Sequence, residues 1–203
     1  MEFLNMFKKS ANELKSIRCL ATTGVLIAVY VTMNSPIFSI NTEMLKITFG
    51  YLALAAIGML FGPVVAVIAA VPCDIIAAMI GSLGINPVFT IPKILEGLIY
   101  GIFLYGYGLR SANSGGAGWA AWQVGRIVLA RFLIMSLVYL VLNSFLIYTI
   151  YGVSADSFAA FMAPRVVKNA IQFPIDLALM FLFLPVLGVA YNKINARFGK
   201  ASS

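Results

Sequence analysis

The sequence predicts an all-α integral membrane protein with six transmembrane helices in one compact bundle. Three observations predict it: 62% of the 203 residues are hydrophobic, only 10% are charged, and the mean hydropathy is +0.97. A soluble domain of this length could not bury so much apolar surface. Helices are expected because the hydrocarbon core offers backbone groups no water, and the alternating pattern of an outer-membrane barrel is missing.

The chain begins with a basic, amphipathic segment. Three lysines accompany the apolar side chains of Phe3 and Phe7, and no convincing signal-peptide cleavage site follows. We therefore expect residues 1–16 to form a cytoplasmic interfacial segment. This segment should lead into a first retained span over about 17–34.

The longest apolar stretch covers residues 47–92 and is almost without charge. At 1.5 Å per helical residue it would be roughly 70 Å long, too long for one crossing of a ~30 Å hydrocarbon layer. The chain must turn back, and Gly62-Pro63 is the predicted turn, because proline suits the first turn of a new helix and disfavours helix in the residue before it. The sequence therefore predicts a hairpin of spans 47–61 and 63–81.

Three further spans are expected over about 92–110, 121–150 and 164–191. The first of them carries Gly97 and Gly101, which form a small-residue face that allows close helix packing. All six spans belong to a single membrane domain that covers residues 1–203.

Basic residues are distributed unevenly between the two ends of these spans. Both termini are basic, and Arg126 and Arg131 fall early in the fifth span on the same side. Fewer basic residues, among them Lys93, Arg165 and Lys168, fall on the other side. The positive-inside rule therefore predicts that both termini are cytoplasmic.

The available side chains exclude several classes of function. The chain contains no histidine, which removes imidazole catalysis and histidine metal sites, and no P-loop, so it does not hydrolyse ATP itself. Membrane orientation explains the net charge of +7 better than nucleic-acid binding, because no basic patch lies on a soluble module. We expect a protein that is not an enzyme and that uses no cofactor and no metal.

The cations on the outer side are the most informative residues. Lys93 lies in the first turn of the fourth span, and Arg165 and Lys168 lie in the first turns of the sixth. Helix N-termini already carry partial positive charge, so cations beside two helix N-termini would suit the binding of an anion. Asn169 continues the polar face of the sixth span, together with Gln172 and Asp176 at helical spacing, and such a stripe normally faces the bundle interior.

Plainer interpretations of these charges remain open. Arg165 and Lys168 could extend to lipid headgroups, or pair with Asp156 and Glu43. Glu96 lies three residues after Lys93 and offers it a neutralising partner. The intramembrane acids Asp74 and Asp176 are expected to be hydrogen-bond acceptors rather than proton or cation sites.

The order of these pieces resembles the substrate-binding S component of energy-coupling factor (ECF) vitamin transporters, most closely the folate-transporter-like branch. Five short stretches carry the resemblance: 46–51 (KITFGY), 58–64 (GMLFGPV), 97–101 (GLIYG), 164–169 (PRVVKN) and 174–175 (PI). It extends over nearly the whole chain.

The resemblance implies a vitamin-binding membrane subunit of a bacterial cytoplasmic membrane. It would capture folate or a related anionic vitamin on the outer side and dock on a transmembrane coupling subunit and two ATPase subunits. The substrate-binding residues implied are Arg165, Lys168, Asn169, Lys93, Phe89 and Tyr51. The face toward the coupling subunit would contain Ala21, Gly24 and Ala28.

Two departures from the family's pattern leave the vitamin open. Residues 86–92 differ from the segment that the family usually has before the fourth span. Cys73-Asp74 stands where the family has an Ala-Asp pair. An S component for a different B vitamin is therefore an alternative. Two alternatives from other classes of function are an ion-coupled secondary transporter and a structural scaffold. For Gly24 and Ala28, the alternative is that these small residues simply pack within the bundle.

Overall fold

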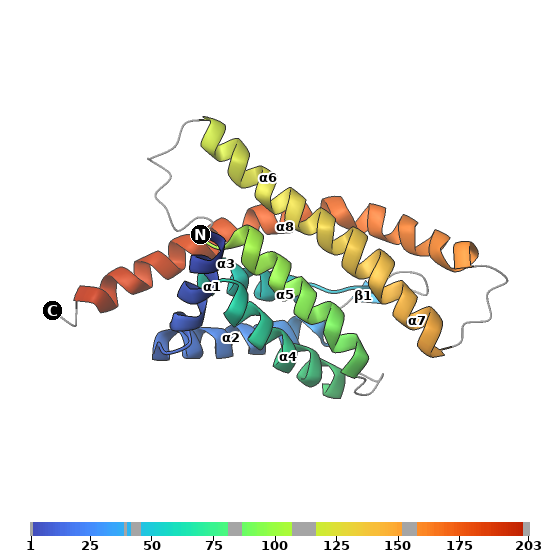
Figure 1. Ribbon diagram of the computed structural model, residues 1–203, viewed down its shortest axis with the longest axis horizontal. Coiled ribbons are helices and arrows are strands. Elements are labelled where there is room, and N and C mark those ends of the chain that lie inside the picture. Colours follow the sequence, from blue (N-terminus) through green and yellow to red (C-terminus); the bar gives the residue numbers. More distant parts are fainter. Residues whose placement is uncertain are drawn as a thin grey trace.

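The computed structural model is a bundle of helices with both chain termini at the same end (Figure 1). It describes residues 2–38, 40–41, 46–80, 87–106, 117–151 and 158–200, and the structural statements below refer to these residues. Helices dominate the fold, as the composition predicts, and the strands are limited to one two-residue pair, Ile40–Asn41 (β1) and Lys46–Ile47 (β2), which run antiparallel.

The helices follow one another along the whole chain. They are α1 (Glu2–Glu13), α2 (Ile17–Asn34), α3 (Tyr51–Phe61), α4 (Pro63–Ile80), the 3-10 turn η1 (Pro87–Phe89), α5 (Thr90–Leu104), α6 (Ala117–Leu133), the π-helix η3 (Ile134–Leu142), α7 (Asn143–Tyr151) and α8 (Phe158–Lys200). The segments α6, η3 and α7 join end to end without a break.

Five helical segments are long and apolar enough to cross a membrane. Within the described chain they are 17–34, 63–80, 87–104, 122–150 and 161–194. The remaining apolar helix, α3, has 11 residues, or about 16 Å, roughly half of a bilayer's hydrocarbon thickness. It begins at Tyr51 rather than at residue 47, because Lys46 and Ile47 pair with β1 instead of joining the helix.

The turn between α3 and α4 lies at Gly62-Pro63, as the sequence predicts. Gly62 has φ +85°, a left-handed conformation that glycine adopts without steric cost, and Pro63 is the first residue of α4. The sequence does not predict the role of Ser10 on α1. Its buried hydroxyl donates to the carbonyl oxygen of Phe61 (2.7 Å) and accepts from the backbone N–H of Val64 (3.0 Å), which ties α1 to this turn.

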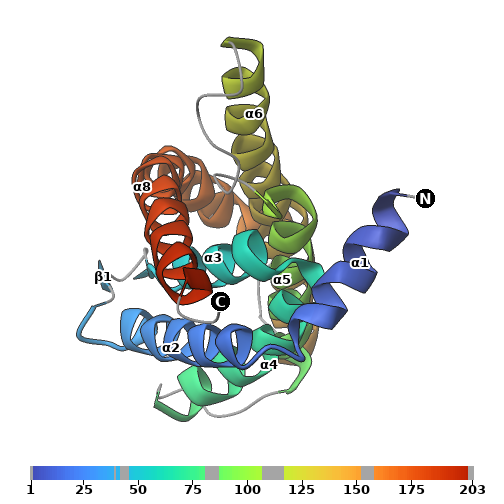
Figure 2. The same ribbon diagram turned by 90° about the vertical axis from the view of Figure 1, so that its left-hand side faces the viewer.

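Helix α3 is the centre of the bundle. All 11 of its residues are buried, and Figure 2 shows it between α2, α5 and α8. Because α3 is short and enclosed, its first residue, Tyr51, lies inside the bundle with only 4% of its surface exposed.

Small residues bring α5 against α3 and α4. A Cβ added at Gly101 would lie 2.2 Å from Pro63 Cα, and one added at Gly97 would lie 2.8 Å from the carbonyl oxygen of Ala66. A Cβ at Gly58 would lie 2.8 Å from the backbone nitrogen of Gly101. The small-residue face predicted on α5 is therefore used for close backbone contact inside the bundle.

Candidate functional site

A cluster of charged and phenolic side chains lies inside the bundle, on α3, α5, α6, η3 and α8. Its members, called the interior cluster below, are Tyr51, Lys93, Glu96, Tyr100, Arg131, Tyr139 and Asp176. Tyr51 is the first residue of α3, which follows β2, and Lys93 lies in the first turn of α5, which follows η1. Polar side chains inside a membrane bundle are costly, so such a cluster is a candidate functional site.

Arg131 connects the helices of this cluster. Its side chain is 1% exposed, and both Nε (3.1 Å) and Nη2 donate to Asp176 Oδ2. Nη1 donates to Tyr100 Oη at 2.7 Å, and the guanidinium lies 4.1 Å from the ring centroid of Tyr51. This one side chain therefore joins α3, α5, α6 and α8.

Lys93 and Glu96 form the second ion pair of the interior cluster. Lys93 Nζ donates to Glu96 Oε2 at 2.9 Å and to Tyr139 Oη at 3.0 Å, and Tyr139 in turn donates to Glu96 Oε2 at 2.7 Å. Arg131 Nη1 lies 3.9 Å from Glu96 Oε1. The expected neutralisation of Lys93 by Glu96 is therefore present, and two cations face two carboxylates in the cluster.

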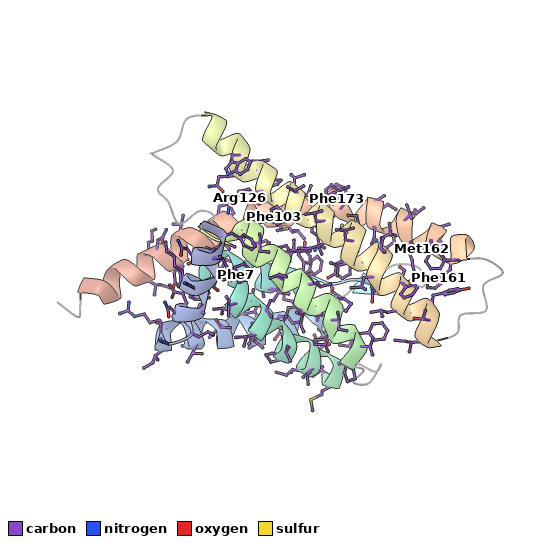
Figure 3. The ribbon with its side chains drawn as sticks, in the orientation of Figure 1. Phe7, Phe103, Arg126, Phe161, Met162 and Phe173 are labelled. Carbon is purple, nitrogen blue, oxygen red and sulfur yellow. The ribbon has the colours of Figure 1, made fainter. Side chains whose placement is uncertain are left out.

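The position of Arg131 corrects an expectation. The sequence predicts it on the basic cytoplasmic side, but Arg131 is buried and paired with a carboxylate 45 positions later in the chain. Arg126 donates to the carbonyl oxygens of Phe103 (2.6 Å) and Tyr105 (3.0 Å), and so caps the end of α5 (Figure 3). An arginine deep in an apolar segment, with Asp176 and Glu96 in other spans, is the signal that could have indicated the pair.

Helix α8 begins at Phe158, not at residue 164, so Arg165 and Lys168 lie two to three turns into the helix and not in its first turn as the sequence predicts. Figure 3 marks this end of the bundle by Phe161. Arg165 Nη1 donates to Ser144 Oγ at 3.3 Å, and the Arg165 guanidinium lies 4.3 Å from the ring centroid of Phe161. Among the described residues it has no carboxylate partner. The suggested partners Asp156 and Glu43 lie outside the described residues.

The polar stripe of α8 turns into the bundle as the helix proceeds. Arg165, Lys168 and Asn169 are half-buried, whereas Gln172 is 8% exposed and Asp176 is fully buried. The stripe therefore runs from the end of the bundle into the interior cluster, over 11 residues between Arg165 and Asp176, or about 16 Å of helix.

The structure brings only some of the expected site residues together. Tyr51 and Lys93 belong to the interior cluster, and Phe89 lies in η1, four residues before Lys93. Arg165 makes no described contact with the cluster itself, but its partner Ser144 donates to the backbone oxygen of Tyr139 (3.4 Å). Tyr139 lies on the π-helix η3, and π-helical segments are frequent at functional sites.

The other intramembrane acid, Asp74, has a local role. Its Oδ2 accepts a hydrogen bond from Thr90 Oγ1 at 2.7 Å, which links the second half of α4 to the first residue of α5. The expected role of Asp74 and Asp176 as hydrogen-bond acceptors is what the structure shows.

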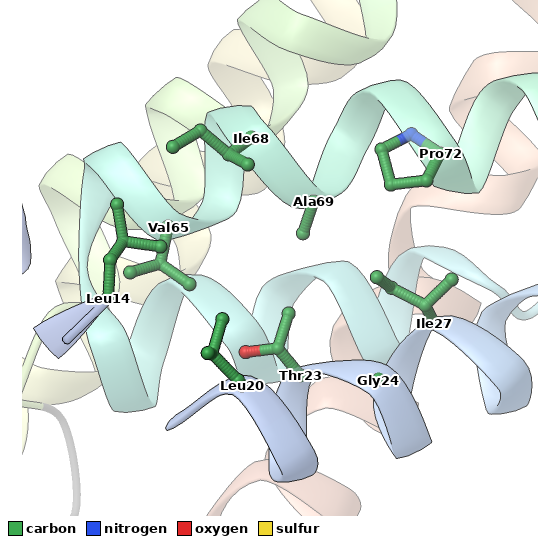
Figure 4. Close-up of a pocket in the computed structure, with 9 residues that line it drawn as sticks. All are labelled: Leu14, Leu20, Thr23, Gly24, Ile27, Val65, Ile68, Ala69 and Pro72. Atoms are coloured by element: carbon green, nitrogen blue, oxygen red, sulfur yellow. The ribbon is translucent and has the colours of Figure 1, made fainter. Parts of the chain in front are cut away.

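Small residues on α2 present an open face. Ala21, Gly24 and Ala28 are exposed, and a Cβ added at Gly24 would meet nothing within 4 Å. Gly24 also borders an apolar cavity of about 190 Å³ between α2 and α4, which Figure 4 shows with Thr23, Ile27 and Ala69 around it. These small residues therefore do not serve close packing inside the bundle, in contrast to those of α5.

Comparison with known proteins places these features in a family. Residues 18–184 match the family model for the ECF transporter, substrate-specific component. A folate transporter FolT of Clostridium novyi (strain NT) is 31% identical over 144 residues, 70% of this chain and 74% of the relative. A folate transporter FolT of Leuconostoc mesenteroides subsp. mesenteroides is 28% identical over 164 residues, 79% of this chain and 81% of the relative.

A solved structure agrees with these sequence matches. The crystal structure of FolT bound with folic acid superimposes with a TM-score of 0.65 and 32% sequence identity, over 85% of this chain and 92% of that chain. The family match and this structural similarity both extend over most of the described helices. The chain therefore belongs to the family of substrate-specific components of ECF transporters.

Proposed function

We propose that this chain is a folate-binding S component of an ECF-type importer. The observation that carries the proposal is the similarity to FolT bound with folic acid, which is 32% identical and covers 85% of this chain. Two relatives that are folate transporters support the same substrate. A family of substrate-specific transporter components has a binding role, so the chain acts as a receptor for the vitamin rather than as an enzyme.

The topology that goes with this function is six spans with both termini in the bacterial cytoplasm. The five long helical segments supply five of these spans, and the short helix α3 supplies the remaining one. The position of both termini at one end of the bundle supports an even number of crossings (Figure 1). Basic residues at that end, on α1 and in the last turns of α8, support its cytoplasmic orientation. Folate is then captured from the opposite, outer side.

Arg165 is the residue proposed to hold a carboxylate of folate. Its guanidinium forms a planar fork that suits a carboxylate, and its described contacts are a hydroxyl and an aromatic ring rather than an acid. Lys168 and Asn169 follow it on the same helix and add polar contacts. Lys93 contributes less, because Glu96 already neutralises it.

The rings of Phe89 and Tyr51 are proposed to stack against the flat heterocycle of the vitamin. Their positions differ in depth. Phe89 is half-buried in η1, whereas Tyr51 is buried beside Arg131. A ligand that touches both would extend from the end of the bundle toward its centre.

The open face of α2 is proposed to dock on the transmembrane coupling subunit, which two ATPase subunits energise. The exposure of Ala21, Gly24 and Ala28 supports this role, because a partner helix can approach a small-residue face closely.

Calorimetry on the purified, detergent-solubilised protein tests the substrate. We expect saturable binding of folic acid, and mass spectrometry of the freshly purified protein should find a folate as a co-purified small molecule. Absence of heat with folic acid, together with tight binding of another B vitamin, would contradict folate as the substrate while leaving the family unchanged.

A further inference from the structure

The apolar cavity between α2 and α4 is a groove that opens on the outside of the bundle. Both helices are long and apolar enough to span a membrane, and Figure 2 shows them at one edge of the bundle. Leu20 and Ile68, which line the groove, are 56% and 50% exposed. Thr23 is the only polar side chain among the described lining residues. The groove therefore offers an apolar surface to the surrounding lipid.

Two small residues leave the groove unfilled. A Cβ added at Gly24 would meet nothing within 4 Å, and Ala69 contributes only a methyl group from the facing helix (Figure 4). Side chains that border an empty apolar space lose packing contacts, and such spaces stay free of water. An apolar chain from outside the protein is therefore the occupant that restores these contacts.

Leu14 lies at one end of the groove, beside α1 (Figure 4). It belongs to the turn between α1 and α2, and the buried hydroxyl of Ser10 fixes α1 against the α3–α4 turn. The family model matches residues 18–184, so Leu14 and α1 lie outside it. This end of the groove is therefore built by a segment that the family model does not include.

The segment that forms this end is strongly basic. Four side chains on it or just after it are cationic and exposed: Lys8, Lys9, Lys15 and Arg18. Glu13 is the only acid from residue 3 to residue 18. Because Lys15 directly follows Leu14, positive charge adjoins the apolar groove at its end.

We propose that the groove binds one acyl chain of an acidic phospholipid, with the headgroup phosphate beside Lys15. The lipid comes from the leaflet at the basic end of the bundle, which in the proposed topology is the negatively charged cytoplasmic leaflet. A phospholipid joins an apolar chain to an anion, as the groove and the adjoining cation require. The inference concerns the outer surface of the bundle and does not depend on which vitamin the protein binds.

Native mass spectrometry of the purified full chain tests the proposal. The protein is titrated with phosphatidylglycerol, or with phosphatidylcholine of the same acyl chains. We expect one phosphatidylglycerol to be retained with an affinity about fivefold higher than that of phosphatidylcholine, the value of one cation near a membrane surface. Glycerol 3-phosphate, which has the phosphate but no acyl chain, should not bind.

Two variants separate the groove from the charge. Ala69→Leu fills the groove, so both phospholipids should bind about tenfold more weakly or less, because the acyl chain loses buried methylene groups. Lys15→Gln leaves the groove open, so only phosphatidylglycerol should weaken, about fivefold, and the preference between the two lipids should disappear. Circular dichroism shows whether Ala69→Leu is folded, and Lys15→Gln decides the question if it is not.

Lys193→Gln is the matched control. It also removes one exposed cation, but from α8, which supplies none of the described lining residues, so binding of both lipids should stay as in the native protein. Equal binding of the two phospholipids by the native protein, or an unchanged preference in Lys15→Gln, would overturn the proposal. Unchanged lipid binding by a folded Ala69→Leu would also overturn it, and if that variant lost uptake by the assembled transporter, the groove would hold a side chain of a partner protein instead.

Discussion

Two arginines at different depths of the bundle contrast in how their charge is used. Arg131 is 1% exposed, and its nitrogens bind Asp176 and Tyr100 while its plane covers the ring of Tyr51. Arg165, near the start of α8, is half-buried and contacts the Ser144 hydroxyl and the Phe161 ring. One guanidinium is neutralised inside the protein, and the other has no acid beside it within the described residues.

The two arginines therefore differ in role: Arg131 stabilises the fold, whereas Arg165 is available to bind a ligand. A buried ion pair holds helices together, and losing one partner leaves an uncompensated charge in a low-dielectric interior. A guanidinium bound only to a hydroxyl and a ring can still form two charge-assisted hydrogen bonds with a carboxylate. We therefore expect Arg131 to determine stability and Arg165 to determine affinity for the anionic end of the ligand.

Substitution of Arg131 should have the largest effect. Arg131→Met leaves Asp176 buried and unpaired, and we expect the free energy of unfolding in detergent to fall by about 3–5 kcal/mol. Denaturant titration followed by circular dichroism measures the change. The double variant Arg131→Met/Asp176→Leu should recover most of the loss, because no charge then remains unpaired. A single variant as stable as the native protein would contradict the structural role of Arg131.

Substitution of Lys93 should have an intermediate effect on stability. Lys93→Met removes one charged donor from Glu96, which keeps its hydrogen bond from Tyr139 and its nearby partner Arg131. The expected loss in the same unfolding assay is about 1.5–3 kcal/mol, the worth of a hydrogen bond to a charged group. A loss as large as that for Arg131→Met would mean that the two ion pairs are equally important.

Substitution of Arg165 should barely affect stability. Its contacts are a hydroxyl and a ring at the end of the bundle, so Arg165→Ala should change the free energy of unfolding by no more than about 0.5 kcal/mol. Arg165→Lys, which replaces the fork by a point charge, should be equally stable and should bind folic acid with an affinity between those of the native protein and Arg165→Ala. A strongly destabilised Arg165→Ala would assign this arginine to the corner between α7 and α8.

Substitution on the α2 face should change neither stability nor binding. An added side chain at Gly24 meets open space, so Gly24→Leu should keep the native unfolding profile and the native affinity for folic acid, and should abolish only uptake by the assembled transporter. Gly101→Leu is the matched control, because a Cβ at Gly101 lies 2.2 Å from Pro63 Cα and should disrupt the fold. Loss of folate binding by Gly24→Leu in the isolated protein would contradict the docking face.

Features coded by neighbouring residues could be predicted from the sequence. The turn at Gly62-Pro63, a helix over residues 17–34 and the small-residue face of Gly97 and Gly101 depend on local conformation and side-chain size, and the structure has all three. The short length of α3 could not be predicted, because its start depends on the pairing of β2 with β1 rather than on the apolar run that surrounds it.

Contacts between distant residues could not be predicted. Arg131 and Asp176 are 45 positions apart, and Ser10 meets the Phe61 carbonyl 51 positions away. No helical or strand periodicity connects such residues. The sequence therefore predicts Arg131 on the basic cytoplasmic side and not in the interior of the bundle. The polar stripe of α8 can be recognised in the sequence because its members share one helix. The interior cluster that it enters cannot, because its members come from five elements.

We propose that folate is held in two separate places: Arg165 binds a carboxylate of the tail, and the rings of Phe89 and Tyr51 stack on the heterocycle. Calorimetric titration of Arg165→Ala with folic acid, and with a pterin that lacks the glutamate tail, tests it most directly. We predict that folic acid binds roughly 10- to 100-fold more weakly, since each charge-assisted bond is worth about 1.5–3 kcal/mol, while the pterin binds as to the native protein. Equal losses for both ligands, or no loss for folic acid, would contradict the account.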